Sequence, residues 1–220
     1  MQRIESFFLA GPAGRIECLL KRPTGAVQGA AAAICHPHPM FGGTMHNKVV
    51  HAAAEALGRA GLPVLRFNFR GVGGSGGEHD AGKGEQDDLR AVLDHLAALY
   101  PGAPLLATGY SFGAYVALRT GCVDPRVAAL IAIGLPLTLV DFSFLRGCAK
   151  PLAIVQGAED MFGPGPLVMA LGASLPGGAR VTVIPGAAHG FGGHLEELAE
   201  RVVEAVPEEL RPPAPAAAAD

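Results

Sequence analysis

The chain has 220 residues, half of them hydrophobic, and 17 basic against 20 acidic side chains give it a net charge of −3. This length and apolar content suit one domain with a well-buried core. The near-balanced charge, without a block of one sign, argues against nucleic acid or an anionic bilayer as the partner. We expect one domain over residues 1–210, a small-molecule substrate, and a disordered Pro/Ala-rich tail over residues 211–220.

Targeting and cysteine patterns predict a cytoplasmic protein. The early apolar run FFLA is too short for the core of a signal peptide, and no run is long enough to span a membrane. The four cysteines are scattered and form no C-x-x-C pair, so neither a zinc ribbon nor a dense disulfide framework is indicated. We therefore predict free buried thiols at Cys18, Cys35, Cys122 and Cys148.

The order of apolar runs predicts an α/β fold. Residues 3–11 and 14–23 are two extended runs around Gly-Pro-Ala-Gly, which is typical of a hairpin. Strand-like runs then alternate with helical segments, as crossover connections in a parallel sheet require. The expected strands are 31–35, 64–69, 104–110, 127–134, 151–157 and 179–186. Helices are expected after the cap Asn47, along Leu89 to Leu96, after Ser111 and along Leu195 to Val206.

Two glycine-rich segments resemble nucleotide-binding loops without meeting their requirements. GVGGSG at 71–76 fits G-x-G-x-x-G, but a polar glycine-bearing loop follows where that motif needs a helix. GEHDAGKG at 77–84 approaches a phosphate-binding loop, yet Gly84 stands where a Ser or Thr must hold magnesium. We interpret the first as a tight turn and the second as surface, and we expect no cofactor.

A third segment, GYSFG at 109–113, is a G-x-S-x-G motif in the context that its chemistry needs. A predicted strand precedes Ser111 and a predicted helix follows it, with Gly121 as its expected stop. On such a sharp turn the serine adopts a strained backbone conformation, while Gly109 and Gly113 let strand and helix pass closely. Ser111 is therefore the candidate nucleophile.

The rest of a Ser, Asp, His triad is present in the expected chain order. Asp160 follows the strand that ends in VQG, and His189 follows the strand that ends near Pro185. Glu159 is an open alternative to Asp160, and Asp141 is a weaker one. The other histidines considered lie inside predicted helices or away from strand ends, so we expect structural or solvated roles for them: His51, His79, His95 and His194.

Together these motifs resemble the α/β-hydrolase superfamily, and in particular a group of small, capless bacterial serine hydrolases carrying HPHP-x-x-GGTM, then NKVV and RFNFRG-x-G-x-S. The similarity runs from about residue 4 to about residue 205. It implies a mostly parallel eight-stranded sheet with helices on both faces, no large cap domain, and a Ser111, Asp160, His189 triad. It does not imply a substrate.

The resemblance also explains the segment HPHPMFGG. An oxyanion hole in this fold takes one backbone N–H from Phe112 and another from the loop after the third strand. Pro37 and Pro39 have no N–H, which leaves His38, Met40 or Phe41 as the second donor, held in place by the fixed proline φ angles. A zinc site of Cys35, His36 and His38 would have too few ligands on one short segment, so no metal is expected.

We expect a serine hydrolase that cleaves a small carboxylic ester, resembling a carboxylesterase, through an acyl-enzyme. A histidine base predicts a rate that rises through neutral pH. The segment 135–150 is too short for a cap, and its apolar residues are candidates either for the pocket or for the core: Leu137, Phe142, Phe144 and Leu145. Thioester or amide cleavage stays open, as do the oligomeric state and a noncatalytic binding module on the same scaffold.

Overall fold

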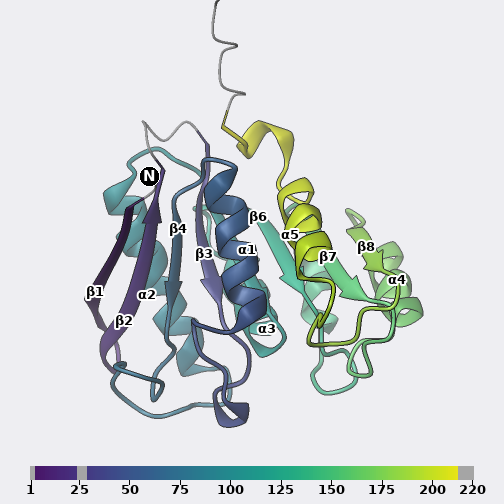
Figure 1. Cartoon of the computed structure of the whole chain (residues 1–220), viewed down its shortest axis with the longest axis horizontal. Helices are drawn as coiled ribbons and strands as arrows, with labels where there is room; N and C mark the ends of the chain where they lie inside the picture. Colours follow the sequence, from purple (N-terminus) through teal and green to yellow (C-terminus); the bar gives the residue numbers. More distant parts are fainter. Residues whose placement is uncertain (1–2, 24–28, 213–220) are drawn as a thin grey trace, which may run out of the picture.

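A computed structural model describes residues 3–23 and 29–212, so most of the predicted tail lies outside the described residues. Eight strands form one sheet in the order β1-β2-β4-β3-β5-β6-β7-β8 (Figure 1). The first two strands, β1 (Arg3–Gly11) and β2 (Gly14–Arg22), form the predicted hairpin, and β2 also pairs antiparallel with β4. All other pairings are parallel. The predicted fold class is confirmed.

The parallel strands lie where the sequence predicts them, with small differences at their ends. Their bounds are β3 Ala31–Cys35, β4 Val64–Phe67, β5 Leu105–Tyr110, β6 Val127–Ile133, β7 Leu152–Gly157 and β8 Arg180–Ile184. β4 ends two residues before the predicted limit. Its continuation leaves the sheet because the Phe69 N–H donates to the His36 ring instead of to a neighbouring strand.

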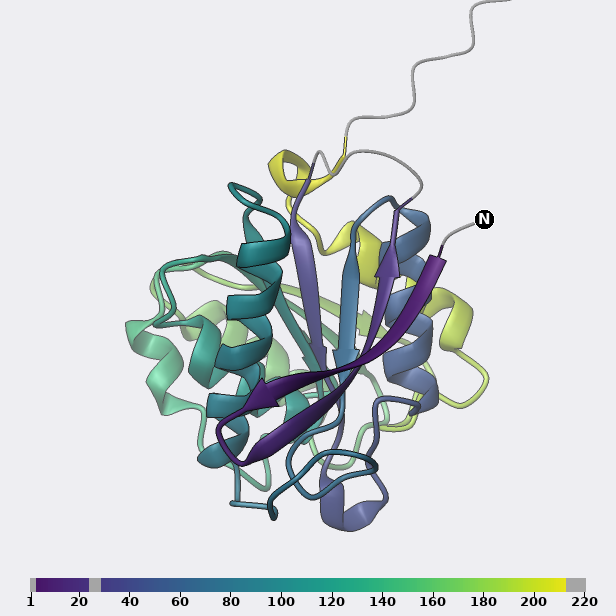
Figure 2. The ribbon, with the colours of Figure 1, turned by 90° about the vertical axis from the view of Figure 1, so that its left-hand side faces the viewer.

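Helices cover both faces of the sheet (Figures 1 and 2). α1 (Lys48–Arg59) and α5 (Leu195–Glu204) pack on one face, where the predicted cap Asn47 accepts a hydrogen bond from the Val49 N–H. α2 (Gly84–Leu99), α3 (Phe112–Gly121) and α4 (Gly165–Ser174) pack on the other. No helix within the described ranges combines the length and the apolar character needed to cross a bilayer.

One helix differs from the sequence-based expectations, whereas the predicted end of α3 agrees with the structure. α4 is not predicted because its apolar residues do not form one stripe: Leu167 and Met169 are both about half exposed, whereas Val168 between them is buried. α3 ends at Gly121, as predicted. A Cβ there would lie 2.4 Å from Leu130 Cδ2, so this glycine lets α3 pack closely against β6.

The connection between β6 and β7 contains only a short 3-10 helix, Ser143–Gly147, and no cap domain. Its apolar residues pack into the core: Phe142 and Leu145 are buried, and the rings of Phe142 and Phe144 lie 5.9 and 6.1 Å from the Tyr115 ring of α3. These residues therefore belong to the hydrophobic core beside α3.

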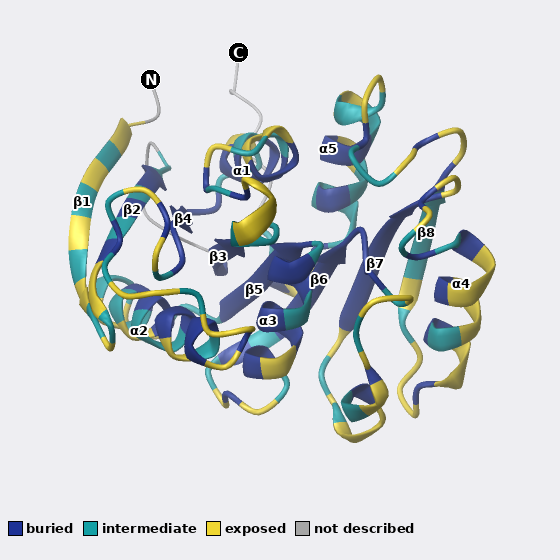
Figure 3. Cartoon of the chain, turned by 90° about the horizontal axis from the view of Figure 1, so that it is seen from below, coloured by how far each residue is buried: buried dark blue, intermediate teal, exposed yellow. Residues whose placement is uncertain are grey.

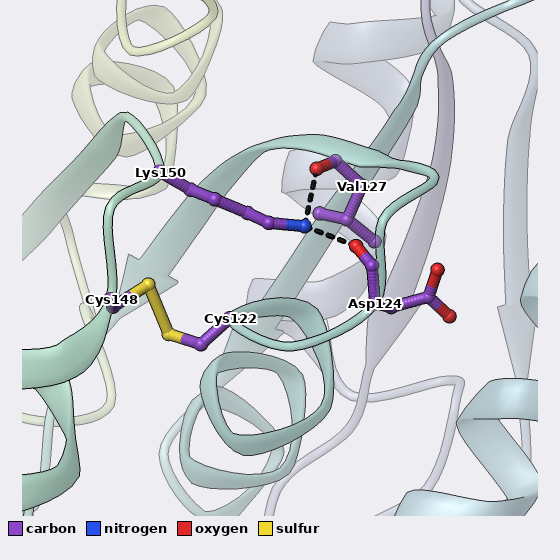
Figure 4. The surroundings of a disulfide bond; sticks show 5 residues. All are labelled: Cys122, Asp124, Val127, Cys148 and Lys150. Carbon is purple, nitrogen blue, oxygen red and sulfur yellow. Dashed lines mark hydrogen bonds between the residues drawn. A yellow bond between two sulfur atoms is a disulfide. The ribbon is translucent and has the colours of Figure 1, made fainter.

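A disulfide corrects the prediction of four free thiols. Cys122, directly after α3, is bonded to Cys148 in the β6–β7 connection, with a Cα–Cα distance of 5.2 Å. The Lys150 ammonium donates beside it to the carbonyls of Asp124 and Val127 (Figure 4). Cys18 and Cys35 are free and buried, as predicted, and burial raises the pKa of the Cys18 thiol to about 12. The sequence spacing gave no signal that Cys122 and Cys148 meet.

Alkylation of the unfolded, unreduced chain should therefore modify two of the four cysteines, and prior reduction should expose all four, as counted by intact mass. Replacing Cys122 and Cys148 together by Ala should destabilise the chain by about 3 kcal/mol in urea unfolding, because the disulfide closes a loop of 26 residues. Four reactive thiols in the unreduced chain would show that the disulfide does not form.

Candidate active site

The site lies at the carboxyl edge of the sheet, where the chain leaves β3 and β5 in opposite directions. β3 leads through α1 to β4 on one side, and β5 leads through α3 to β6 on the other. Loops that diverge at such a switch point open a crevice at the strand ends. Figure 3 looks onto this edge and shows the exposed 3-10 helix Pro39–Phe41 above the ends of β3 and β5. The HPHPMFGG segment follows β3 and the GYSFG segment follows β5 at this switch point.

Ser111 sits on a sharp turn between β5 and α3. Its backbone has φ 56° and ψ −121°, the strained conformation expected of an exposed nucleophile. A Cβ at Gly109 would lie 2.1 Å from the Gly113 carbonyl oxygen, and a Cβ at Gly113 would lie 2.4 Å from the Cys35 carbonyl oxygen. Both glycines are therefore required for strand, turn and helix to pass this closely.

Asp160, His189 and Ser111 form one hydrogen-bonded chain. His189 Nε2 lies 2.9 Å from Ser111 Oγ, and His189 Nδ1 lies 2.7 Å from Asp160 Oδ2. The Asp160 carboxylate is 1% exposed, and its Oδ1 accepts the Phe162 N–H at 2.9 Å. A buried carboxylate with these partners fixes the imidazole with Nδ1 protonated and Nε2 facing the serine hydroxyl.

Aromatic contacts fix the position of the His189 ring. The Tyr110 ring lies 5.2 Å from it, and the Tyr110 hydroxyl donates to the His189 carbonyl at 2.9 Å. The Phe162 ring meets it edge to face at 4.9 Å. Gly134 has φ 58°, and a Cβ there would approach both the Tyr110 ring and the His189 ring. The imidazole is thus held between neighbours from the end of β5 and from the loops after β6 and β7.

The competing acids lie elsewhere. Glu159 is exposed, and the Asp141 carboxylate caps its own turn by accepting from Ser143. Sequence reasoning missed Gln156 at the end of β7: its Nε2 donates to Asp160 Oδ2 at 2.8 Å, and its Oε1 accepts the Leu135 N–H. The signal in the sequence was a polar residue near the end of an otherwise apolar strand. Gln156 holds the carboxylate toward His189.

Among the residues that the structure describes, the backbone N–H groups of Phe112 and His38, whose rings lie 4.8 Å apart, have no acceptor. One is the Phe112 N–H, the first of α3, where a helix leaves its donors unused. The other is the His38 N–H. The Met40 N–H, by contrast, donates to His38 Nδ1 at 3.2 Å, and the Phe41 N–H donates to the His38 carbonyl at 3.1 Å. Of the three loop residues considered, His38 therefore has the free donor.

The first histidine of HPHP is part of the scaffold. His36 is fully buried; its Nδ1 lies 2.7 Å from the Pro37 carbonyl oxygen and its Nε2 accepts the Phe69 N–H at 3.0 Å. Both ring nitrogens are used within the protein, so His36 links the loop after β3 to the segment after β4. Burial lowers the pKa of this imidazole from 6.5 to about 4.

This depressed pKa predicts a loss of stability in acid. Because the folded-state value lies below the unfolded one, protonation favours unfolding, and the stabilisation is complete above pH 6.5 and lost as the pH falls toward 4. The gap corresponds to about 3 kcal/mol. Between pH 7 and pH 4 the free energy of unfolding, measured in urea, should fall by about 3 kcal/mol more for the wild type than for His36→Gln. Equal losses in the two proteins would contradict the role of the buried imidazole.

The GVGGSG segment is a turn packed on the hairpin, as the sequence predicts. The Gly74 N–H donates to the Glu17 carboxylate at 2.7 Å, and the Gly76 N–H donates to the Arg15 carbonyl at 2.9 Å. The Ser75 hydroxyl donates to the Asn68 carbonyl. These donors are used inside the protein and do not form a phosphate cradle.

The prediction that residues 77–84 are surface is wrong in part. Gly82 and Gly84 are buried, and the side chain of His79 is only 18% exposed. The His79 ring lies 5.5 Å from the Phe112 ring and 4.8 Å from the His38 ring. Because this segment follows a loop and not a strand end, its sequence did not place it beside the serine.

Comparison with known proteins agrees with this architecture. Residues 30–150 match the family model described as Serine aminopeptidase, S33. This match covers more than half of the chain, so the chain belongs to that family and is an α/β-hydrolase.

Similar structures span nearly all of the chain. A serine hydrolase homologue from Coxiella burnetii is 40% identical, with a TM-score of 0.87 and coverage of 92% of this chain and 97% of that one. A serine hydrolase without a lid from Xanthomonas campestris is 37% identical, with a TM-score of 0.88 and 97% coverage of both chains. An uncharacterised protein from Rickettsia prowazekii is 42% identical over 157 residues, which are 70% of this chain and 66% of that relative.

Proposed function

We propose that the chain is a serine hydrolase of the small, capless HPHP-x-x-GGTM group, that Ser111, His189 and Asp160 are its catalytic triad, and that it hydrolyses a small carboxylic ester. One observation carries the proposal. An unbroken chain runs from Ser111 Oγ through His189 to the buried Asp160 carboxylate, and unused backbone N–H groups lie on Phe112, which follows Ser111, and on His38, whose ring is 4.8 Å from the Phe112 ring. That combination supplies a nucleophile, a base, its orienting acid and an oxyanion hole.

In this mechanism His189 Nε2 takes the proton of Ser111 as Oγ attacks the acyl carbonyl carbon. Asp160 holds the imidazole orientation and stabilises the imidazolium. The Phe112 and His38 N–H groups bind the oxyanion, and His189 then gives the proton to the leaving alcohol. Water, activated by the same histidine, releases the acid from the acyl-enzyme and restores Ser111.

The short β6–β7 connection supports a small substrate that can reach the serine from solvent. The β6–β7 connection holds a 3-10 helix and no cap, so only loops surround the serine. Met40, Phe41 and Met161 on loops of this edge are 72%, 87% and 74% exposed, which gives apolar contacts for an acyl or alcohol group. We propose a cytoplasmic enzyme acting on an acyl compound, with the ester ahead of the thioester and the amide.

The test compares leaving groups on one acyl chain. Initial rates with p-nitrophenyl butyrate, a butyryl thioester and butyryl p-nitroanilide should fall in that order, and Ser111→Ala should abolish all three. An aminoacyl p-nitroanilide tests the peptide activity that the family description suggests. Preference for that amide over the ester would replace the proposed substrate class, and no turnover of any substrate by folded wild type would favour a noncatalytic binding module.

A further inference from the structure

We propose that His79 is a positioning residue for the oxyanion hole, holding in place the two residues, His38 and Phe112, whose N–H groups bind the oxyanion. The inference rests on the proposed function, because it gives a role to groups beside the proposed nucleophile. It assigns the loop 77–83 as one wall of the site.

Three rings form a triangle at this wall. The centroids of His38 and His79 lie 4.8 Å apart, those of His38 and Phe112 lie 4.8 Å apart, and those of His79 and Phe112 lie 5.5 Å apart. The His79 ring therefore touches both donor residues at once. The His38 ring is also tied to the backbone of its own turn, because His38 Nδ1 accepts the Met40 N–H.

A buried carboxylate fixes the loop that carries His79. Glu85, in the first turn of α2, is fully buried; its Oε1 accepts the Asp80 N–H at 2.9 Å and its Oε2 accepts the Gly82 N–H at 2.8 Å. His79 Nδ1 lies 2.7 Å from Oε1, a close contact that does not meet hydrogen-bond geometry. Burying a carboxylate is costly unless hydrogen bonds compensate for the lost water, and the two backbone N–H groups of this loop supply them. The proposed triad does not use Glu85, so holding this loop is the role that its contacts support.

Glycines bring the same loop close to the donor residues. Gly82 has φ 90°, and a Cβ there would lie 3.0 Å from the Tyr115 ring and 3.5 Å from the Phe112 ring. A Cβ at Gly84 would overlap the Arg70 guanidinium, which is paired with Asp88. The loop thus packs against Phe112 at two points, Gly82 and the His79 ring.

The position of the donors matters because an oxyanion hole works by being aligned before charge develops. A misplacement of about 1 Å costs up to about 100-fold in rate. Substrate binding depends less on the donors than the rate does, because the donors contact the oxyanion most strongly in the transition state. Loss of the His79 ring should therefore lower kcat and leave KM nearly unchanged.

The experiment measures kcat and KM on p-nitrophenyl butyrate for wild type, His79→Ala, His79→Phe and the matched control His46→Ala, an exposed histidine of the β3–α1 loop. We expect His79→Ala to lower kcat about 10- to 100-fold with KM within about twofold, and His79→Phe, which restores a ring, to recover kcat to within about threefold. His46→Ala should match wild type. If His79→Ala does not fold, His79→Leu replaces it.

Amide spectra of the same variants, labelled with ¹⁵N, provide a readout that needs no turnover. His79→Ala should shift the backbone amide signals of His38 and Phe112, and His46→Ala should leave both unmoved. Wild-type kcat in His79→Ala, a loss that Phe does not repair, or unmoved amide signals would overturn the positioning role. Absence of turnover by folded wild type would instead overturn the proposed function and with it the oxyanion-hole role, and the amide shifts would then report whether His79 fixes the positions of His38 and Phe112.

Discussion

Asp160→Asn is expected to lower kcat about 10⁴-fold while the fold is retained, the loss seen when the acid of a serine triad becomes an amide. Asp160 Oδ2 faces both His189 Nδ1 at 2.7 Å and Gln156 Nε2 at 2.8 Å. The amide cannot stabilise the imidazolium, and it lets the imidazole adopt the tautomer with Nε2 protonated, which cannot accept the Ser111 proton. Steady-state kinetics on the preferred ester measures the effect, and circular dichroism checks the fold.

The neighbouring acid provides the matched control. Glu159 is exposed and contacts the loop only through its backbone, where its N–H donates to the Ala187 carbonyl. Glu159→Gln should keep kcat within about threefold of wild type, since a solvated surface charge contributes little. If instead Glu159→Gln lost most activity and Asp160→Asn kept more than a tenth of it, Asp160 would not be the triad acid.

Gly113→Ala is expected to remove both stability and activity. The added Cβ would lie 2.4 and 2.5 Å from the carbonyl oxygens of Cys35 and His36, and 2.6 Å from the Cys35 carbonyl carbon. These are backbone atoms at the end of β3, so α3 and the loop that carries His38 must move apart. Forcing atoms into a packed interior costs about 3 kcal/mol, and here it also separates the two oxyanion donors. Urea unfolding and ester kinetics measure the two effects.

Gly147→Ala is the control for the same chemical change. Within the part of the chain that the structure describes, no atom beyond Gly147 and its two chain neighbours lies within 4 Å of a Cβ there, and its backbone does not have a positive φ. Its unfolding midpoint and kcat should match those of wild type. A Gly113→Ala variant as stable and active as Gly147→Ala would show that α3 does not approach β3 as closely as described.

The sequence predicted the parts of the site whose chemistry depends on local pattern. A nucleophile turn needs glycines at fixed offsets from Ser111, and a strand end next to Asp160 or His189 places each on one edge of a parallel sheet. The fold class followed for the same reason, since strand-like and helical runs alternate along the chain. These features depend on residues that are neighbours in the sequence, so the sequence alone predicts them.

The contacts that the sequence did not predict join segments far apart in the chain. Cys122 meets Cys148 only because α3 and the β6–β7 connection end at one side of the sheet, and nothing in the spacing marks this. His79 reaches His38 through a loop whose course Glu85 sets from the next helix. Gln156, near the end of β7, donates from its side-chain amide to the Asp160 carboxylate in the loop that follows. Such pairings depend on the assembled tertiary structure.

The central claim is that Ser111 is a nucleophile activated by His189. Its most direct test is labelling by a fluorophosphonate, followed by intact mass, on wild type, Ser111→Ala and His189→Ala. The account predicts one probe adduct on each wild-type chain and none on either variant. Folded wild type that stays unlabelled, or Ser111→Ala that is labelled as fast as wild type, would contradict it.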